Sequence, residues 1–489
     1  MLTPDQLQTY ALAEIEISLQ GHGKSIENYP EMPQPDRSLV PEITNRLIHD
    51  ELHYNRPVLE EEHRKLMSTM TSEQRNVYDT IMKRVSEKKP GLFFLYGYGG
   101  TGKTYLWRSM ASALRSKGEI VITVASSGIA ALLIPGGRTA HSRFGIPIEI
   151  HETSSCNICP NSDLGQLIVR AKLIIWDEAP MLHKHCFESV DRAFRDVLRS
   201  SNNGNTDIPF GGKVVVLGGD FRQILPVIPK GSRQEIVHAS INSSYLWDSC
   251  EVLTLTRNVR LISAGSDIDA FERRSFAEWI LAIGDGTIGD SNDVDISVTV
   301  FDDLLIPSYG DPLAAIVYST YPNLFDNIHD PFFFTDRAIL APTNAIVDTI
   351  NQYVLDLMPG EDRSYLSCDS PCVANSTGGG LGDVHTPEFL NTITTSGLPN
   401  HVLRLKVGVP VMLLRNIDQN LGLCNGTRLI ITKMGTYDLE AIVTSGSNIG
   451  DKVFIPRLSL TPSDKRIPFA FQRRQFPIRV CFAMTINKS

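Results

Sequence analysis

Residues 92–107 read LFFLYGYGGTGKTYLW, an apolar run that leads into a glycine-rich loop and then into a helix-like segment. The loop fits the pattern GxxxxGKT, which requires a strand before it and a helix after it. In such a loop, backbone N–H groups surround phosphate oxygens, the lysine adds positive charge near the β and γ phosphates, and the threonine hydroxyl can ligate Mg²⁺. The stretch therefore predicts a P-loop for a nucleoside triphosphate, with contacts from Gly97, Gly99, Gly100, Thr101, Gly102, Lys103 and Thr104.

The chain has 489 residues, more than one hydrophobic core can organise, so it should divide into two or more domains. Hydrophobic residues make up 42% and charged residues 21%, a globular balance without a membrane-length apolar run. The net charge of −9 argues against a uniformly basic coat, but a basic groove on an acidic body could still bind nucleic acid. Eight dispersed cysteines and an N-terminus without a signal-like apolar segment predict an intracellular protein.

Short apolar runs recur after the loop, separated by helical or loop segments; they include EIVITVA, KLIIWDEA and KVVVLGGD. This alternation indicates an α/β fold with a parallel sheet covered by helices. We expect residues 1–70 to form an N-terminal arm with little core of its own, residues 71–255 to form the first domain, and residues 256–489 to form the second. A small β-rich insert is expected in the second domain at about 403–475.

Two of these strands end in polar residues suited to nucleotide hydrolysis. KLIIWDEA places Asp177 where it could hold Mg²⁺ together with Thr104, and Glu178 where it could orient or deprotonate the attacking water. In KVVVLGGDFRQ, Gln223 could sense the γ-phosphate and Asp220 could hold the adjoining loop, although a strand ending in GGD could also be a plain turn. The pattern therefore predicts hydrolysis as well as binding.

From residue 71 onward the chain resembles the Pif family of superfamily 1B DNA helicases, and in particular its Helitron-type, plant-like members. The motifs that carry the resemblance follow in family order: SEQRNVYDTI, GYGGTGKT, ASSGIAALLIPGGRTAHSRFGIP, IIWDEAPM, GGDFRQILPV, LTRNVRL, APTNAIVDTIN, GVPVMLLRNID, LCNGTRLI and CFAMTINKS. The resemblance implies two RecA-like P-loop domains with parallel sheets, ATP and Mg²⁺ in the cleft between them, and single-stranded DNA across their tops.

The resemblance also implies a role for individual residues. It makes Gln74 the adenine-reading glutamine, Lys103 and Thr104 the Walker A pair, Asp177 and Glu178 the Walker B pair, Gln223 the γ-phosphate sensor, and Arg260 a second-domain arginine that faces the γ-phosphate. Without the resemblance, Arg260 could also be a solvated surface cation. The implied DNA contacts are Thr139, His141, Ser142 and Phe144 in the first domain and Thr343 and Asn344 in the second.

The implied activity is ATP-dependent DNA unwinding with 5′ to 3′ translocation on single-stranded DNA, in repair, recombination or telomere and genome maintenance. The implied partners are single-stranded and forked or structured DNA, with no membrane, and the chain would act as a monomer. The nucleus is the expected compartment, and the mitochondrion is the alternative.

The sequence departs from the family pattern at its end. Family members continue past TINKS into a last motif whose arginine completes the ATP site, whereas this sequence stops at Ser489. The resemblance therefore implies an incomplete second RecA-like domain. Two hypotheses stand: an ATP-driven DNA helicase, or a truncated remnant that binds ATP and nucleic acid without unwinding.

One basic stretch allows two interpretations. Residues 465–479 read KRIPFAFQRRQFPIR, in which aromatic and basic side chains are interleaved. Such a run could form a DNA-facing surface or an ordinary strand at the edge of a sheet.

Overall fold

In the computed structural model the chain folds as two compact units. The first unit comprises Met1–Val124, His141–Asp220 and Ile228–Arg260, and the second comprises Ala125–Ala140, Phe221–Val227 and Leu261–Ser489. The structure describes residues 8–9, 11–12, 15, 26, 29, 32–34, 45–199, 207–228, 231–262, 267–288, 297–307, 310–328, 330, 332–372, 386–395, 397–418, 421–445, 448–462, 467 and 469–486.

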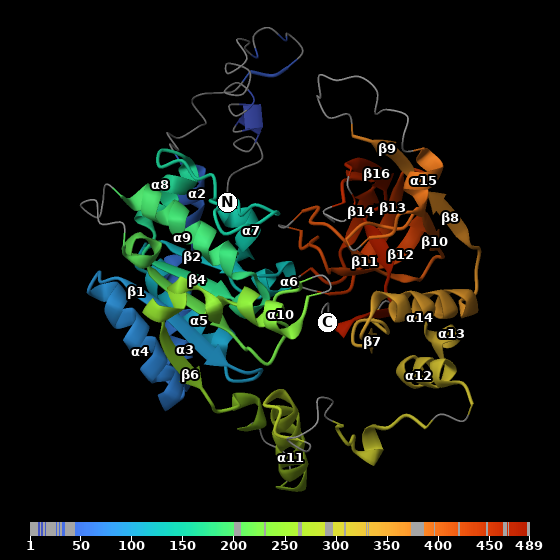
Figure 1. Cartoon of the computed structure of the whole chain (residues 1–489), viewed down its shortest axis with the longest axis horizontal. Coiled ribbons are helices and arrows are strands. Elements are labelled where there is room, and N and C mark those ends of the chain that lie inside the picture. Colours follow the sequence, from blue (N-terminus) through green and yellow to red (C-terminus); the bar gives the residue numbers. More distant parts are fainter. Residues whose placement is uncertain are drawn as a thin grey trace. The chain divides into compact units, whose positions relative to one another are not determined.

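A six-stranded sheet with strand order β3-β2-β4-β5-β1-β6 is built from residues 91–255 (Figure 1). Strand β1 lies between β5 and β6 and is parallel to both, and β4 is parallel to β5. The strands are β1 (Gly91–Gly97), β2 (Val121–Ala125), β3 (Arg138–Thr139), β4 (Leu173–Asp177), β5 (Val214–Gly219) and β6 (Glu251–Leu255). The helices are α2 (Arg46–Leu52), α3 (Arg56–Thr69), α4 (Ser72–Ser86), α5 (Lys103–Arg115), α6 (Gly128–Leu132), α7 (Ala140–Phe144), α8 (Asp163–Arg170), α9 (Lys184–Leu198) and α10 (Arg233–Ala239).

The sequence patterns account for these elements. Strands β2, β4 and β5 are buried along their whole length, as expected for parallel strands with both faces covered. Helix α4 begins at a capping box, in which the Thr71 hydroxyl accepts the Gln74 N–H and the Gln74 side chain accepts the Thr71 N–H. The predicted parallel α/β sheet around the P-loop is therefore confirmed.

Residues 45–69 are part of the first unit rather than a separate arm. Helix α2 buries the Glu51 carboxylate between two cations, at 3.2 Å from Arg115 Nη2 and 3.5 Å from Arg143 Nη2. The hydroxyl of Tyr105 on α5 donates to the Leu66 carbonyl of α3. The fold therefore does not divide at residue 70, because side chains and carbonyls of residues 45–69 form ion pairs and hydrogen bonds with residues of α5 and α7.

The second unit combines helices with short antiparallel sheets. Its helices are α11 (Asp267–Gly284), α12 (Pro312–Thr320), α13 (Leu324–Asn327), α14 (Asn344–Leu357) and α15 (Pro387–Thr392). Strand β7 (Ile339–Ala341) is parallel to β18 (Ala483–Thr485), and Asn351 of α14 accepts the Ala483 N–H at 2.7 Å. One apolar core packs α12 and α14 against β7 and against strands of the antiparallel sheets. Among the described residues, no helix has the length and apolar character needed to cross a bilayer.

The antiparallel part of this unit is wider than the predicted insert at 403–475, because its strands run from Arg363 to Val480. The sheets have the orders β10-β8, β14-β13-β12-β11-β17 and β15-β16-β9. Their strands are β8 (Arg363–Leu366), β9 (Cys368–Pro371), β10 (Val402–Leu405), β11 (Pro410–Leu413), β12 (Arg428–Met434), β13 (Asp438–Val443), β14 (Lys452–Pro456), β15 (Leu458–Leu460), β16 (Phe471–Gln475) and β17 (Ile478–Val480). The pairing of β11 with β17 and of β9 with β16 brings in segments from outside the predicted limits.

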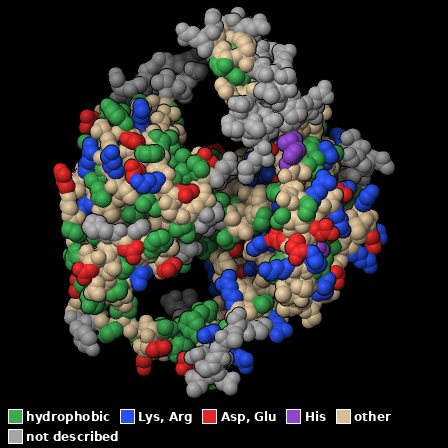
Figure 2. Space-filling model, turned by 180° about the vertical axis from the view of Figure 1, so that it is seen from behind, with side chains coloured by type: hydrophobic (Ala, Val, Ile, Leu, Met, Phe, Trp, Pro, Cys, Tyr) green, Lys and Arg blue, Asp and Glu red, His purple; other side chains and the backbone are tan. Residues whose placement is uncertain are grey.

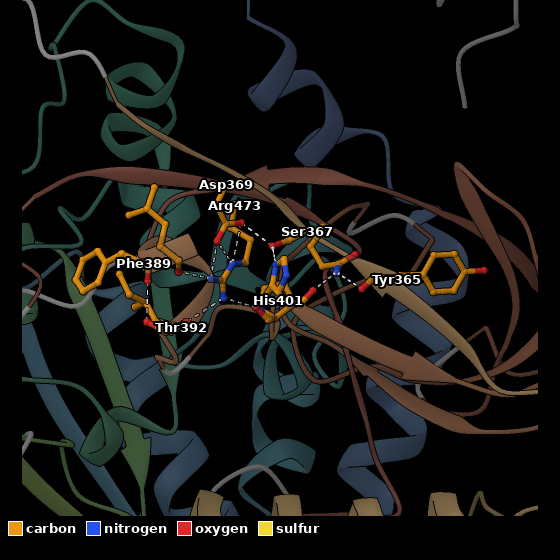
Figure 3. A network of polar contacts seen from close by, with 11 residues as sticks. Tyr365, Ser367, Asp369, Phe389, Thr392, His401 and Arg473 are labelled. Atoms are coloured by element: carbon orange, nitrogen blue, oxygen red, sulfur yellow. Dashed lines mark hydrogen bonds and ion pairs between the residues drawn. The ribbon is translucent and has the colours of Figure 1, made fainter. Parts of the chain in front are cut away.

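The described part of the basic run, residues 467 and 469–479, is not one edge strand: its last two residues begin β17, at the edge of the five-stranded sheet, and Lys465 and Arg466 lie outside the described residues. The central residues of the run form β16, the middle strand of its sheet, and Arg473 is completely buried. The Arg473 guanidinium donates to both oxygens of Asp369 and to the carbonyls of Leu390, Ile393 and Pro399 (Figure 3). A buried ion pair thus holds α15 and the loop after it against β9 and β16.

Replacing Arg473 by leucine is expected to destabilise the second unit by about 3–5 kcal/mol, because Asp369 would remain buried without its cation. Hydrogen exchange in peptides covering β9 and β16 measures this loss as a lower free energy of opening. Arg474→Leu is the matched control, since Arg474 is the next residue of the same strand and is exposed. Equal protection in the two variants would contradict the role assigned to the buried pair.

Candidate functional site

The P-loop joins the end of β1 to the start of α5, as its sequence context predicts. Gly100 and Gly102 both have φ of +92°, a conformation that costs residues with a side chain about 1–2 kcal/mol. A Cβ on Gly100 would lie 2.4 Å from Asn258 Oδ1, and one on Gly102 would lie 2.3 Å from Gln74 Nε2. A Cβ on Gly99 would meet nothing within 4 Å. Two of the glycines are therefore required by the fold itself, and Gly99 is not.

Gly100→Ala is expected to lower the stability of the first unit by roughly 1–2 kcal/mol from backbone strain, and by more if Asn258 cannot move away. Gly99→Ala is the control and should unfold at the temperature of the unsubstituted chain. Thermal unfolding of both variants checks the difference. The assignment fails if the two alanines have the same effect on the unfolding temperature.

Lys103 lies at the first position of α5 and is 8% exposed. Its ammonium donates to the carbonyl of Gly97 at the opposite side of the loop. Burial raises the pKa values of Asp177 and Glu178, and the positive charge of Lys103 opposes this rise for both carboxyl groups. The structure thus brings the predicted lysine and the predicted acidic pair to one site at the end of the sheet. Thr104, the next residue, is half-buried.

Asp177 and Glu178 follow β4 and differ in their surroundings. Asp177 is buried, and this burial raises the pKa of its carboxyl group. Three neighbours act in the opposite direction and lower that pKa: the Trp107 indole, the charge of Lys103, and the Glu178 N–H, which donates to the carboxylate. Glu178 has φ of +53°, and its Oε2 is buried without a hydrogen-bond partner. Burial, followed by repulsion from Asp177 and Asp220, raises the pKa of Glu178. A raised pKa makes a carboxylate a stronger base, so Glu178 is suited to accept a proton from water.

The two glycines before Asp220 have a packing role that the sequence alone did not reveal. A Cβ on Gly218 would lie 2.3 Å from the indole ring of Trp107, and one on Gly219 would lie 2.2 Å from Pro180. Trp107 therefore packs directly on β5, and Ala179 and Pro180 pack on the last residue of that strand, Gly219. The GGD stretch is the end of a strand that accommodates both neighbours, rather than a plain turn.

Gln74 supports the P-loop in the structure. Its Nε2 donates to the Thr101 carbonyl at 3.0 Å, its Oε1 accepts the Thr71 N–H, and the residue is 3% exposed. Both ends of the carboxamide are thus engaged with the protein. Adenine recognition by Gln74 stays a prediction.

Gln223 and Arg260 are both exposed and lie in different units. Gln223 belongs to the short segment Phe221–Val227 of the second unit, so its role at the γ-phosphate stays a prediction. Arg260 was expected in the second domain, but it is the last residue of the first unit. The N–H of its neighbour Val259 donates to the carbonyl of Gly100 at 2.9 Å, which brings this segment to the P-loop.

The predicted DNA-contacting segment is only partly accessible. Thr139 and His141 are half-buried, and burial lowers the pKa of His141, which favours the neutral imidazole. Ser142 is exposed. Phe144 is completely buried, with its ring centroid 5.7 Å from that of Trp176 and 5.4 Å from that of Phe194. The expectation that Phe144 stacks on a base is therefore corrected: its ring is part of the core.

In the second unit, Thr343 and Asn344 are exposed at the start of α14. The Thr343 hydroxyl accepts the Ile346 N–H, and Arg479 Nη1 donates to Asn344 Oδ1 at 2.8 Å. Arg479, which also forms an ion pair with Asp348, lies beside the two predicted contacts. No local sequence signal links positions so far apart. Elsewhere, basic and acidic side chains are interspersed over the face drawn in Figure 2, so charge alone does not mark a DNA surface there.

Comparisons with known proteins find similarity to Pif1 helicases over the region that contains the P-loop. A profile of the PIF1-like helicase family matches residues 69–294, and a profile of the 2B domain of DNA helicase Pif1 matches residues 388–434. The ATP-dependent DNA helicase PIF1 of Xenopus laevis is 25% identical over 449 residues, 92% of this chain and 59% of that protein. The ATP-dependent DNA helicase Pif1 of Psychrobacter sp. is 28% identical over 337 residues, 68% of this chain and 43% of that protein. The chain thus spans about half the length of these relatives.

A similar fold occurs in solved structures. The Bacteroides Pif1 helicase in complex with ADP-AlF3 and single-stranded DNA superposes with a TM-score of 0.56 at 21% identity, over 86% of this chain and 83% of that chain. The parallel sheet and the P-loop lie within residues 69–294, the part of the chain that the helicase-family profile matches. Together the two profiles match more than half of the chain, and this chain therefore belongs to the Pif1-like helicase family.

Proposed function

We propose that this protein is an ATP-dependent DNA helicase that couples ATP hydrolysis to movement along single-stranded DNA and to duplex unwinding. The observation that carries the proposal is the meeting of Lys103, Asp177 and Glu178 beside the P-loop. A cation for the β and γ phosphates, a carboxylate for a metal and a second carboxylate for water are the groups that phosphoryl transfer to water requires. The family membership supports DNA as the partner.

The residues at the P-loop also fit Mg²⁺. Thr104 and Asp177 offer oxygen atoms, which Mg²⁺ prefers, and burial raises the pKa of Asp177, so a bound cation would favour its charged form. When bound there, Mg²⁺ would neutralise charge on the β and γ phosphates. Lys103 would hold the same phosphates from the other side, and Glu178 would orient the attacking water and accept its proton.

The candidate DNA contacts lie in both units: His141 and Ser142 are in the first unit, and Thr139, Thr343 and Asn344 are in the second. We therefore propose that movement of one unit relative to the other during the ATP cycle shifts one grip past the other. The family resemblance suggests 5′ to 3′ movement. Unwinding of partial duplexes with either a 5′ or a 3′ single-stranded tail tests this direction, and preference for the 3′ tail would overturn it.

Single-stranded DNA should bind more tightly than duplex of the same length, and its affinity should fall as salt rises. Each phosphate neutralised by a lysine or arginine releases counterions, which gives a slope of about −0.7 per contact in a plot of log affinity against log salt. Fluorescence anisotropy at several salt concentrations measures both effects. Arg479→Ala should reduce the slope, and Arg170→Ala, which removes an exposed arginine of α8 outside the predicted contacts, serves as its control. Duplex preference at every salt concentration would contradict the DNA proposal.

Phosphate release with and without single-stranded DNA tests the activity as a whole. We expect DNA to stimulate turnover and forked duplex to be unwound only with ATP and Mg²⁺. The proposed biological roles are repair, recombination or telomere and genome maintenance, by a monomer in the nucleus or, as the alternative, the mitochondrion. Light scattering tests whether the protein is a monomer, and localisation of the tagged full chain tests the compartment.

A further inference from the structure

The segment that leaves β6, residues 256–260, lies directly on the P-loop. We call it the exit segment. The Val259 N–H donates to the Gly100 carbonyl at 2.9 Å. The Asn258 carboxamide covers the α-carbon of Gly100 so closely that a Cβ there would lie 2.4 Å from Asn258 Oδ1. The same oxygen accepts the Arg260 N–H at 3.1 Å. Asn258 therefore contacts the phosphate loop and the backbone of Arg260 at the same time.

The other end of the exit segment is also held. The Glu73 carboxylate accepts the Thr256 N–H at 2.9 Å, the Thr256 hydroxyl at 2.8 Å and the Arg257 N–H at 3.2 Å. The Tyr98 hydroxyl, from within the P-loop, donates to the Thr256 carbonyl at 2.6 Å. Burial would raise the pKa of Glu73, but the hydrogen bonds from Thr256 and Arg257 outweigh it and lower that pKa. The carboxylate is thus charged when it holds the segment.

These contacts join the exit segment to the loop through its backbone. Gly100 and Tyr98 are P-loop residues, and Glu73 precedes Gln74, which itself bonds to the Thr101 carbonyl. A displacement of the loop would therefore move the Thr256 and Val259 ends of the exit segment together. Arg260 follows Val259 directly: its backbone N–H donates to the Asn258 carboxamide oxygen, and its side chain is exposed.

We infer that Asn258, supported by Glu73, is a positioning residue that ties the exit segment to the P-loop and so sets the direction of the Arg260 side chain at the nucleotide. The inference rests on the proposed ATP hydrolysis, and it adds residues to which neither the P-loop pattern nor the comparisons give a role. Asn258 acts through Arg260, so its removal should slow turnover more than it weakens nucleotide binding.

Steady-state hydrolysis by the full chain with single-stranded DNA tests this role. Asn258→Ala should lower kcat about 10- to 100-fold, as a misplaced group can, while KM for ATP changes little. Asn258→Ser should recover part of the loss, because a serine hydroxyl can accept the same N–H two residues on. Asn76→Ala is the control, since Asn76 is an exposed asparagine on α4.

A double substitution separates positioning from a general structural effect. If Asn258 acts through Arg260, the variant carrying both Asn258→Ala and Arg260→Ala should be as slow as Arg260→Ala alone. The inference would be overturned if the double variant lost kcat by the product of the two single losses, or if Asn258→Ala left kcat unchanged. Neither result would contradict the proposal that the protein hydrolyses ATP.

Hydrogen exchange of the ligand-free chain provides a measurement that does not need activity. The peptide that contains Val259 and Arg260 should exchange about tenfold faster in Asn258→Ala than in the unsubstituted chain, as expected for loss of roughly one hydrogen bond. Unchanged exchange would overturn the tie to the loop. A chain that shows this protection but hydrolyses no ATP would instead overturn the proposed function, and the positioning role with it.

Discussion

Replacing Lys103 by alanine is expected to weaken binding of an ATP analogue by about 10- to 150-fold and to abolish hydrolysis. The β and γ phosphates would lose their nearest cation, and one charge-assisted contact contributes roughly 1.5–3 kcal/mol. Asp177 and Glu178 would also lose the positive charge that opposes their mutual repulsion. Titration with a fluorescent ATP analogue measures the change.

Lys117→Ala is the matched control for this experiment. Lys117 lies just beyond the other end of α5 and is exposed, so its removal should leave nucleotide affinity unchanged. Circular dichroism of both variants shows whether the fold is retained. Equal affinity of the Lys103→Ala variant and the unsubstituted chain would remove the P-loop assignment altogether.

Replacing Glu178 by glutamine is expected to lower the rate of hydrolysis by about 10²–10⁴-fold while leaving ATP-analogue affinity nearly unchanged. A glutamine keeps the shape of the side chain but cannot accept the proton of the attacking water. Because the substitution removes negative charge near the phosphates, binding should not weaken. Single-turnover hydrolysis and analogue titration, made on the same preparation, separate the two effects.

The same substitution should make the first unit more stable at neutral pH. The pKa of Glu178 is raised in the folded chain, so folding favours the protonated acid and stability is lost as pH rises from the ordinary glutamate pKa through the raised value. Glu178→Gln removes this loss. The difference in unfolding temperature between the variant and the unsubstituted chain should therefore be small in acid and should grow towards neutral pH.

Glu152→Gln provides the control, because Glu152 is exposed and lies in the same unit. It should change neither turnover nor the pH dependence of unfolding. Glu178 would lose its assigned role if Glu178→Gln hydrolysed ATP at the rate of the Glu152→Gln variant.

Local patterns predicted the P-loop and the strand end at Asp177 and Glu178, because each of these features is contiguous in sequence. A buried strand followed by GYGGTGKT can form few structures other than a P-loop, and a buried strand that runs into Asp177 and Glu178 must place both at the end of the sheet. The capping box at Thr71 is likewise a pattern over four residues. In each case the interacting atoms are brought together by the geometry of one element.

Burial was the property that such patterns predicted poorly. Phe144 and Arg473 belong to residue types that can contact DNA, yet both side chains are completely buried. Phe144 packs between Trp176 and Phe194, and Arg473 is neutralised by Asp369. Whether an aromatic ring or a guanidinium faces solvent depends on partners from distant segments, which no local spacing encodes.

The amino-acid sequence by itself determined that this protein has an α/β fold with a P-loop, a metal-binding aspartate candidate and a candidate catalytic glutamate. Only the tertiary structure decided that residues 45–69 join the first unit, that Gly218 and Gly219 accommodate Trp107 and Pro180, and that Asn258 lies on Gly100. The physical reason is the distance along the chain between the residues that interact. Phosphate-binding geometry comes from backbone conformation over a few residues, whereas these contacts arise only when elements far apart in the chain pack against each other.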